Sequence, residues 1–152
     1  MSASSGMTDR DLIVTRLIDA PRPLVFKAWT DPVQIARWWG PKGFVTVDYD
    51  MDIRPGGSYR FRMRSPDGTD HRKRGVYREI VEPERIVFTF AWEQPDGRLG
   101  LETLITVTLE AEGAKTRLTL HQTGFDTIAW RDDHQIGWTS CLERFAEYMT
   151  TE

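Results

Sequence analysis

Apolar and polar residues alternate along much of the chain. The clearest stretch runs from Val45 to Ile53, where apolar residues at odd positions alternate with threonine or aspartate at even positions. A period of two residues in hydropathy is typical of a β-strand that buries one face. The same pattern, weaker at 71–81, predicts seven strands at residues 12–18, 45–53, 59–64, 71–81, 86–92, 103–109 and 118–122.

Turn-forming residues separate the later strands. Proline and glycine supply the backbone conformations that tight turns need. They occur in every gap from the second strand onward, as Pro55-Gly56-Gly57, Pro66-Asp67-Gly68, Glu82-Pro83, Pro95-Asp96-Gly97 and Glu112-Gly113. Successive strands joined by short turns predict an antiparallel meander.

Three helices are predicted from capping signals and apolar spacing. Asp31 is followed by proline, the arrangement of an N-cap and a first helical residue, so a helix is expected at 32–39. A short helix is expected before it, at 21–29. The last helix is expected at 127–149 with Asp126 as its N-cap, and at 1.5 Å per residue it would be about 34 Å long.

This order of elements predicts an α+β fold. A sheet with one apolar face and one long amphipathic helix can bury both by curling the sheet around the helix, and such a half-barrel leaves room for a cavity. The two short helices after the first strand would close one end. We expect a single domain over residues 8–151, with a curved antiparallel sheet of six to seven strands. Residues 1–7 are expected to be a disordered leader or tag remnant, because they are small and polar and lack the features of a signal peptide.

Composition and charge exclude several classes of protein. The chain has 152 residues, with 20 lysines and arginines against 23 aspartates and glutamates, for a net charge of −3. That balance argues against nucleic acid as a partner, because phosphate binding needs net or clustered positive charge. No apolar run approaches the roughly 18 residues of a membrane span. The single cysteine excludes an intramolecular disulfide framework and a four-cysteine zinc site. A soluble, cytoplasmic protein is expected.

Metal binding and nucleophilic catalysis receive little support. His71, His121 and His134 are dispersed and form no metal-ligand spacing, so no metal and no cofactor are expected. Cys141 lies two helical turns from His134, about 10.5 Å along the axis, which is too far for an activating hydrogen bond. We interpret Cys141 as a buried, inert thiol. No catalytic residues are assigned.

Charged residues face each other across the first predicted hairpin. A turn at residues 55–57 would place Asp52 opposite Arg60, Asp50 opposite Arg62 and Asp48 opposite Arg64. Opposite charges in such cross-strand positions stabilise a sheet by roughly 0.2–1 kcal/mol per pair. We therefore expect a solvent-facing ionic ladder rather than a basic surface for an anionic partner.

Several motifs together resemble one bacterial family. They are Arg37-Trp38-Trp39-Gly40-Pro41-Lys42-Gly43-Phe44, Asp52-Ile53-Arg54-Pro55-Gly56-Gly57, Pro66-Asp67-Gly68, Glu82-Pro83-Glu84-Arg85-Ile86-Val87-Phe88, Gly124-Phe125 and Gln135-Ile136-Gly137-Trp138. The chain resembles, over about residues 8–151, the single-domain homologues of the activator of heat-shock protein 90 ATPase, in the START-like (SRPBCC, Bet v-like) superfamily. The resemblance implies the helix-grip fold, which agrees with the pattern of strands and helices.

The resemblance favours a ligand cavity between the sheet and the last helix. Its predicted lining combines one residue of the second helix, the inward residues of the strands and one stripe of the last helix. These are Trp38, Tyr49, Met51, Tyr59, Phe61, Met63, Tyr77, Phe88, Phe90, Trp92, Ile105, Val107, Leu120, Gln122, His134, Trp138 and Cys141. Of the adjacent tryptophans Trp38 and Trp39, one is expected to anchor its helix and the other to lie at the cavity entrance, because neighbours on a helix point about 100° apart.

Gln122 is the polar exception on the apolar face of its strand. An unpaired amide there would cost roughly 1–3 kcal/mol. It is therefore expected to meet a ligand, a water molecule or a partner such as His134. The alternative of a purely internal hydrogen bond remains equally open.

The favoured function is a binding module for a hydrophobic or amphipathic small molecule. Superfamily membership alone specifies little of function. One alternative is a cyclase- or hydrolase-like enzyme that uses polar residues of the same cavity, with His134, Gln122, Tyr77, Tyr59 and Glu79 as candidates. Another is a chaperone-linked interaction protein, which is less favoured because the eukaryotic activator has a further domain for which this chain has no room. A homodimer is left open.

Overall fold

The computed structural model describes residues 9–151, which form seven strands and three helices. The predicted leader at residues 1–7 lies outside the described residues. The elements, in chain order, are β1 (Leu12–Ile18), α1 (Arg22–Thr30), α2 (Pro32–Trp38), β2 (Val45–Met51), β3 (Ser58–Arg64), β4 (Asp70–Val81), β5 (Arg85–Trp92), β6 (Thr103–Glu112), β7 (Lys115–Thr123) and α3 (Ile128–Thr151).

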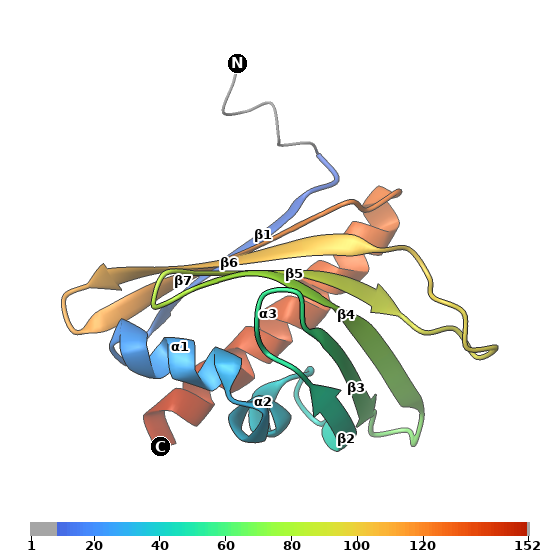
Figure 1. The fold of residues 1–152 in the computed structure, drawn as a ribbon, viewed down its shortest axis with the longest axis horizontal. Coiled ribbons are helices and arrows are strands. Elements are labelled where there is room, and N and C mark those ends of the chain that lie inside the picture. The colour runs from blue at the N-terminus through green and yellow to red at the C-terminus, as the bar shows by residue number, and fades with distance from the viewer. Residues whose placement is uncertain (1–8, 152) are drawn as a thin grey trace.

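The strands form one antiparallel sheet in the order β1-β7-β6-β5-β4-β3-β2. Strands β2 to β7 follow one another as a meander. Strand β1 pairs with β7 and forms the edge of the sheet opposite β2. Figure 1 shows the sheet bending over α3, with α1 and α2 on the same side of the sheet. The prediction of an α+β helix-grip fold with a curved antiparallel sheet is confirmed.

Tryptophan and phenylalanine rings fill the space between the helices and one half of the sheet. Trp38 on α2 is buried, and its ring lies 4.5 Å from that of Trp29 on α1 and 4.7 Å from that of Phe145 on α3. Its indole Nε1 donates a hydrogen bond to the Ala28 carbonyl at 3.0 Å. Trp38 therefore joins all three helices into one core, and edge-to-face contacts of this kind add to the free energy of burial.

Each predicted helix forms, but the cap of the last one differs from the prediction. Asp31 caps α2 as expected, since its carboxylate accepts from the Val33 backbone N–H. Helix α3 begins at Ile128, one residue later than predicted, and the hydroxyl of Thr127 accepts from the Trp130 N–H at 3.1 Å. Thr127, not Asp126, is therefore the N-cap, because the helix begins too late for Asp126 to reach an orphan donor.

Thr127→Ala is expected to lower the free energy of unfolding by about 1 kcal/mol, the usual cost of losing a threonine cap. Asp126→Ala should change it much less, because the cap hydroxyl is retained. Urea unfolding followed by circular dichroism would compare the two variants. A larger loss in Asp126→Ala would reassign the cap.

The ionic pairs across the first hairpin form in a different register from the predicted one. Asp50 lies opposite Arg60 and Asp48 opposite Arg62, so each aspartate pairs two residues earlier than expected. Asp52 lies beyond the strand, because the backbone after it bends to pair with Tyr77, whose carbonyl accepts from the Gly56 N–H and whose N–H donates to the Gly57 carbonyl. The predicted register is wrong.

Ion pairs nevertheless cover this outer surface, with acids from other strands taking part. Arg62 bonds both Asp48 and Asp70, and Arg64 bonds Asp70 at 2.6 Å. Glu93 at the end of β5 accepts from Arg60 at 3.3 Å and lies 3.6 Å from the Arg74 guanidinium. Arginines of β3 and β4 thus form ion pairs with carboxylates of β2 and β4 and with Glu93 at the end of β5.

Candidate functional site

A pocket of about 720 Å³ opens between the sheet and the N-terminal half of α3. Three parts of the chain form its walls: the neighbouring ends of β3, β4 and β5, the loop between α2 and β2, and one face of α3. Its lining comprises Trp39, Gly40, Pro41, Phe44, Met63, Asp70, His71, Arg72, Lys73, Phe90, Trp92, Glu93, Gln94, Pro95, Trp130, Asp133, His134, Gly137, Trp138 and Cys141. The walls are mainly apolar and aromatic, with a small set of polar groups among them.

The loop after α2 is held against α3 by contacts with distant side chains. The Gly40 N–H donates to Cys141 Sγ at 3.3 Å, and the Arg144 guanidinium donates to the carbonyls of Gly40 and Pro41. Gly40 has a φ of 119°, and a Cβ at this position would lie 2.9 Å from Met63 Sδ. Glycine is required there both for the left-handed backbone and for the close approach of the strand.

Lys73 is the one buried charged residue between residues 9 and 151, and it lines this pocket. It is 2 % exposed, and its ammonium Nζ lies 3.5 Å from the centroid of the Trp39 ring. Three further rings surround the ammonium, with centroids at 5.1, 5.6 and 5.7 Å, those of Phe61, Phe90 and Trp92. Burial lowers the pKa of Lys73 well below its ordinary value of 10.5. Cation–π attraction offsets part of the cost of removing this charge from water.

His134 is held as a neutral ring on the α3 wall. Its Nε2 accepts from the Trp92 indole N–H at 2.9 Å, and its Nδ1 lies 2.9 Å from the Trp130 carbonyl. A carbonyl only accepts, so Nδ1 carries the proton and the Nε2 lone pair is already used. Burial lowers the pKa of His134 from 6.5, which also favours the neutral form.

The amide of Gln122 is satisfied within the protein. Its Nε2 donates to the Thr103 hydroxyl at 2.8 Å, and its Oε1 accepts from the Trp138 indole N–H at 2.9 Å. Of the alternatives left open by the sequence, the internal hydrogen bond is the one the structure shows, and the partners are Thr103 and Trp138 rather than His134. Gln122 thereby fixes the orientation of Trp138, which lines the pocket.

Cys141 has the surroundings expected of an inert thiol. It is buried, its sulfur accepts from the Gly40 N–H, and burial raises its pKa to about 11. A thiol that stays protonated at neutral pH is a poor nucleophile. Among the residues that the structure describes, no cluster of three or more histidine, cysteine, aspartate or glutamate side chains could hold a metal ion. No helix in the same part of the chain is both long and apolar enough to cross a membrane.

Six of the residues predicted to line a cavity line this pocket: Met63, Phe90, Trp92, His134, Trp138 and Cys141. The other eleven do not. They are Trp38, Tyr49, Met51, Tyr59, Phe61, Tyr77, Phe88, Ile105, Val107, Leu120 and Gln122. Most of them belong to the solid core, because α1, α2 and the second half of α3 fill the remainder of the concave face. Tyr49 is 39 % exposed on the edge strand β2, where it stacks on Phe61.

The two adjacent tryptophans have different roles. The predicted lining named Trp38, whereas Trp39 is the one that lines the pocket. Trp38 anchors α2 in the core, whereas Trp39 lies against the pocket and against Lys73. His71 also lines the pocket, near the Phe44 and Trp92 rings.

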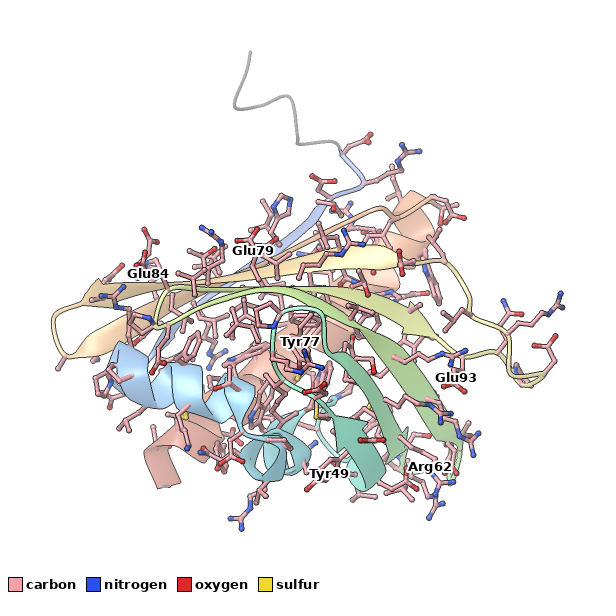
Figure 2. All side chains as sticks on the ribbon, viewed as in Figure 1. Tyr49, Arg62, Tyr77, Glu79, Glu84 and Glu93 are labelled. Carbon is pink, nitrogen blue, oxygen red and sulfur yellow. The ribbon has the colours of Figure 1, made fainter. Side chains whose placement is uncertain are left out.

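Glu79 does not reach the cavity. The pairing of β4 with β5 shifts by one residue between Tyr77 and Glu79, and this bulge turns Glu79 to the outer face. Figure 2 shows Tyr77 on the helix side of the sheet and Glu79 on its outer side, where Glu79 pairs with Arg85 at 2.7 Å. Glu79 is therefore removed from the candidate acids and bases.

Lys73 is the functional candidate that the sequence analysis missed. It has the same strand parity as Tyr77, which was expected to face inward. The alternation signal was therefore present. The residue type gives the opposite indication, because a lysine in the interior of a sheet is rare.

A family model described as Activator of Hsp90 ATPase homolog 1-like protein matches residues 19–150. Among curated proteins, no match is found.

Solved structures match over nearly the whole chain. An AHSA1 protein from Silicibacter pomeroyi has 24 % identity and a TM-score of 0.85, with 93 % of this chain and 98 % of that chain covered. Protein CV1439 from Chromobacterium violaceum has 27 % identity and a TM-score of 0.81, with the same coverage. DynU16, from the dynemicin biosynthetic locus, has 22 % identity and a TM-score of 0.77, with 95 % of this chain and 48 % of that chain covered.

Proposed function

Because the chain belongs to the family of Activator of Hsp90 ATPase homolog 1-like proteins, we propose that it binds a hydrophobic or amphipathic small molecule between the sheet and α3. The family and the fold indicate a domain of the SRPBCC ligand-binding type. The observation that carries the proposal is the pocket of about 720 Å³ with aromatic walls. Pockets for small molecules usually have roughly 300–1,000 Å³, apolar walls and few polar groups.

Hydrogen bonds orient two of the tryptophan rings that line the pocket, which favours binding. The tryptophan rings on its two sides are held by hydrogen bonds: Trp92 donates to His134, and Trp138 donates to Gln122. Apolar burial contributes about 25 cal/mol per Å² before the costs of association are subtracted. Walls that do not need to be ordered on binding reduce those costs.

An acid–base enzyme in the same cavity has less support. Such an enzyme needs a base with a free lone pair next to the substrate. Of the five predicted acid–base candidates, His134 alone lines the pocket, and its Nε2 lone pair already accepts from the Trp92 indole. A chaperone-linked role likewise has no specific observation of the structure in its favour.

Gly137 provides a direct test, because it lines the pocket from α3. A Cβ placed on it would meet only Pro41 Cγ, 3.9 Å away, so a side chain there would extend into the pocket. Gly137→Phe is expected to fill the space and to lower the affinity for a ligand at least tenfold. Gly137→Ala is the matched control. It should retain the ligand and raise the free energy of unfolding by about 0.5–1 kcal/mol, since alanine favours a helix interior.

The measurement is native mass spectrometry of the wild type and both variants, purified gently from the protein's own host. The wild type and Gly137→Ala should carry the same non-covalent mass addition, lost on denaturation, and Gly137→Phe should lack it. A bare mass for the wild type, or an equal addition on Gly137→Phe, would count against this pocket as the binding site.

A further inference from the structure

The ammonium of Lys73 has no anion to balance it. Over residues 9–151, it has neither a hydrogen-bond acceptor nor an ion-pair partner. Four aromatic rings surround it, and the Cys141 thiol on α3 lies near enough for its charge to raise the Lys73 pKa. Resting on the proposed function, we propose that the ligand is an amphipathic organic anion. Its carboxylate, or a head group of equivalent charge, would pair with Lys73, and its apolar body would lie against the tryptophans of the pocket.

The carboxylates of Asp70 and Glu93, which also line the pocket, do not pair with Lys73. Asp70 is bonded by Arg62 and Arg64. Glu93 is engaged by Arg60 and Arg74, and its side chain is only 9 % exposed. Both carboxylates are therefore committed to the outer face of the sheet.

Two other charged side chains line the pocket, Asp133 and Arg72, and each acts on a group other than Lys73. Asp133 on α3 acts on His134, whose pKa it raises against the larger effect of burial. Arg72 has the opposite strand parity from Lys73 and helps to lower the pKa of Asp70. His134, which lies on α3 opposite the sheet, is neutral. No carboxylate of the pocket is therefore paired with the Lys73 ammonium, so the anionic group of a ligand has no competitor there.

A buried cation selects its ligand by the sign of the charge. A neutral ligand offers the ammonium at most an uncharged hydrogen-bond acceptor, whereas a carboxylate also neutralises its charge in a medium of low dielectric constant. A cationic ligand would add repulsion. The direction of the Lys73 pKa supports the same selection, because burial makes the charged amine costly and a bound anion reverses that cost.

Two probes with the same apolar body would test the charge preference. We suggest 1-naphthylacetate and 2-(1-naphthyl)ethanol, which differ in replacing a carboxylate by a hydroxyl-bearing carbon, with binding measured by isothermal titration calorimetry. The wild type is expected to bind the carboxylate at least about tenfold more tightly than the alcohol. Lys73→Met and Lys73→Gln should lose that preference.

Lys115→Met is the matched control. It removes the same charge from the first residue of β7, where Lys115 pairs in register with Glu112 and does not line the pocket. It should bind both probes as the wild type does.

Proton uptake gives a second, independent measurement. Carboxylate binding, repeated in two buffers of different ionisation enthalpy, should be accompanied by uptake of protons from the buffer in the wild type. Uptake should be absent in Lys73→Met. The reason is that an anion raises the pKa of the amine that it contacts.

The outcomes distinguish this inference from the proposed function. If both probes bind alike, or the preference for the carboxylate survives in Lys73→Met, the inference of an anionic ligand is wrong. The proposed apolar binding pocket is then unaffected. If neither probe binds the wild type at millimolar concentration, the proposed function is contradicted, and the anionic ligand with it.

Discussion

Lys73→Met is expected to raise the free energy of unfolding of the ligand-free protein by about 1–4 kcal/mol at pH 7. Methionine fills a similar volume among the rings of Trp39, Phe61, Phe90 and Trp92, and it brings no charge that must be removed from water. The lost cation–π attraction is worth about 2 kcal/mol or more in a desolvated site, and the expected gain is what is left after this loss. A stabilising substitution in a pocket wall is the pattern expected where function, rather than folding, requires the residue.

The same residue gives stability a characteristic dependence on pH. Burial lowers the pKa of Lys73 in the folded protein, so between that lowered value and 10.5 the unfolded chain binds more protons than the folded one. Stability must therefore rise with pH across this interval, by up to about 1.4 kcal/mol per pH unit. The penalty from Lys73 is complete below the folded pKa and vanishes above 10.5.

Comparison with Lys73→Met isolates this effect, because the other shifted groups of the described chain are present in both proteins. The pKa of His134 lies below 6.5, and that of Cys141 is raised from 9.0 to about 11, so the thiol makes stability fall only above pH 9. The buried tyrosines Tyr59 and Tyr77 have pKa values raised above 10 and act in the same direction as the thiol.

Guanidinium unfolding from pH 7 to 10.5 would compare the wild type, Lys73→Met and Lys115→Met. The excess stability of Lys73→Met over the wild type should shrink as the pH approaches 10.5, and Lys115→Met should follow the wild type. A wild-type stability that is flat with pH, together with a destabilised Lys73→Met, would show that the ammonium is well accommodated.

Gln122→Leu is expected to lower the free energy of unfolding by about 1–3 kcal/mol, although leucine is the more apolar side chain. The substitution leaves the Trp138 indole N–H buried without an acceptor, and it removes the donor to the Thr103 hydroxyl. Thr103 keeps its other hydrogen bond, to the Phe90 carbonyl at 3.0 Å. The orphaned indole is therefore the main cost.

A double-mutant cycle separates this cost from a change in packing. Trp138→Phe removes the donor, so the loss caused by Gln122→Leu should be smaller in the Trp138→Phe background, with a coupling energy of about 0.5–3 kcal/mol. Equal losses in both backgrounds, measured by urea unfolding, would mean that the hydrogen bond contributes nothing.

Hydropathy alternation predicted the strands well because side chains alternate strictly along a strand and strands such as β3, β6 and β7 bury one face. The edge strand β2 keeps the alternation although none of its residues is buried. The prediction failed where the alternation is interrupted. The bulge after Tyr77 reverses the parity of Glu79, and the backbone pairing of Gly56 and Gly57 with Tyr77 shifts the register of the first hairpin. Both irregularities depend on contacts with a neighbouring strand, which periodicity within one strand does not contain.

The location of the pocket could not be predicted for a similar reason. Parity specifies which residues face the helices, but not which part of that face the helices fill. Here the rings of Trp38, Trp29 and Phe145 fill one half of this face. The loop at Gly40 lies over the other half, where the pocket is. The inward direction of Lys73, by contrast, follows from its parity alone and was obscured by the ordinary preference of lysine for the surface.

Four of the chain's six tryptophans line the pocket: Trp39, Trp92, Trp130 and Trp138. The remaining two, Trp29 and Trp38, are buried in the core between the helices. A ligand seated against these four indole rings would change the intensity and wavelength of their ultraviolet emission, while the two core rings would supply a nearly constant background. The protein therefore contains its own optical reporter of occupancy, and libraries of candidate ligands can be screened without attaching a label.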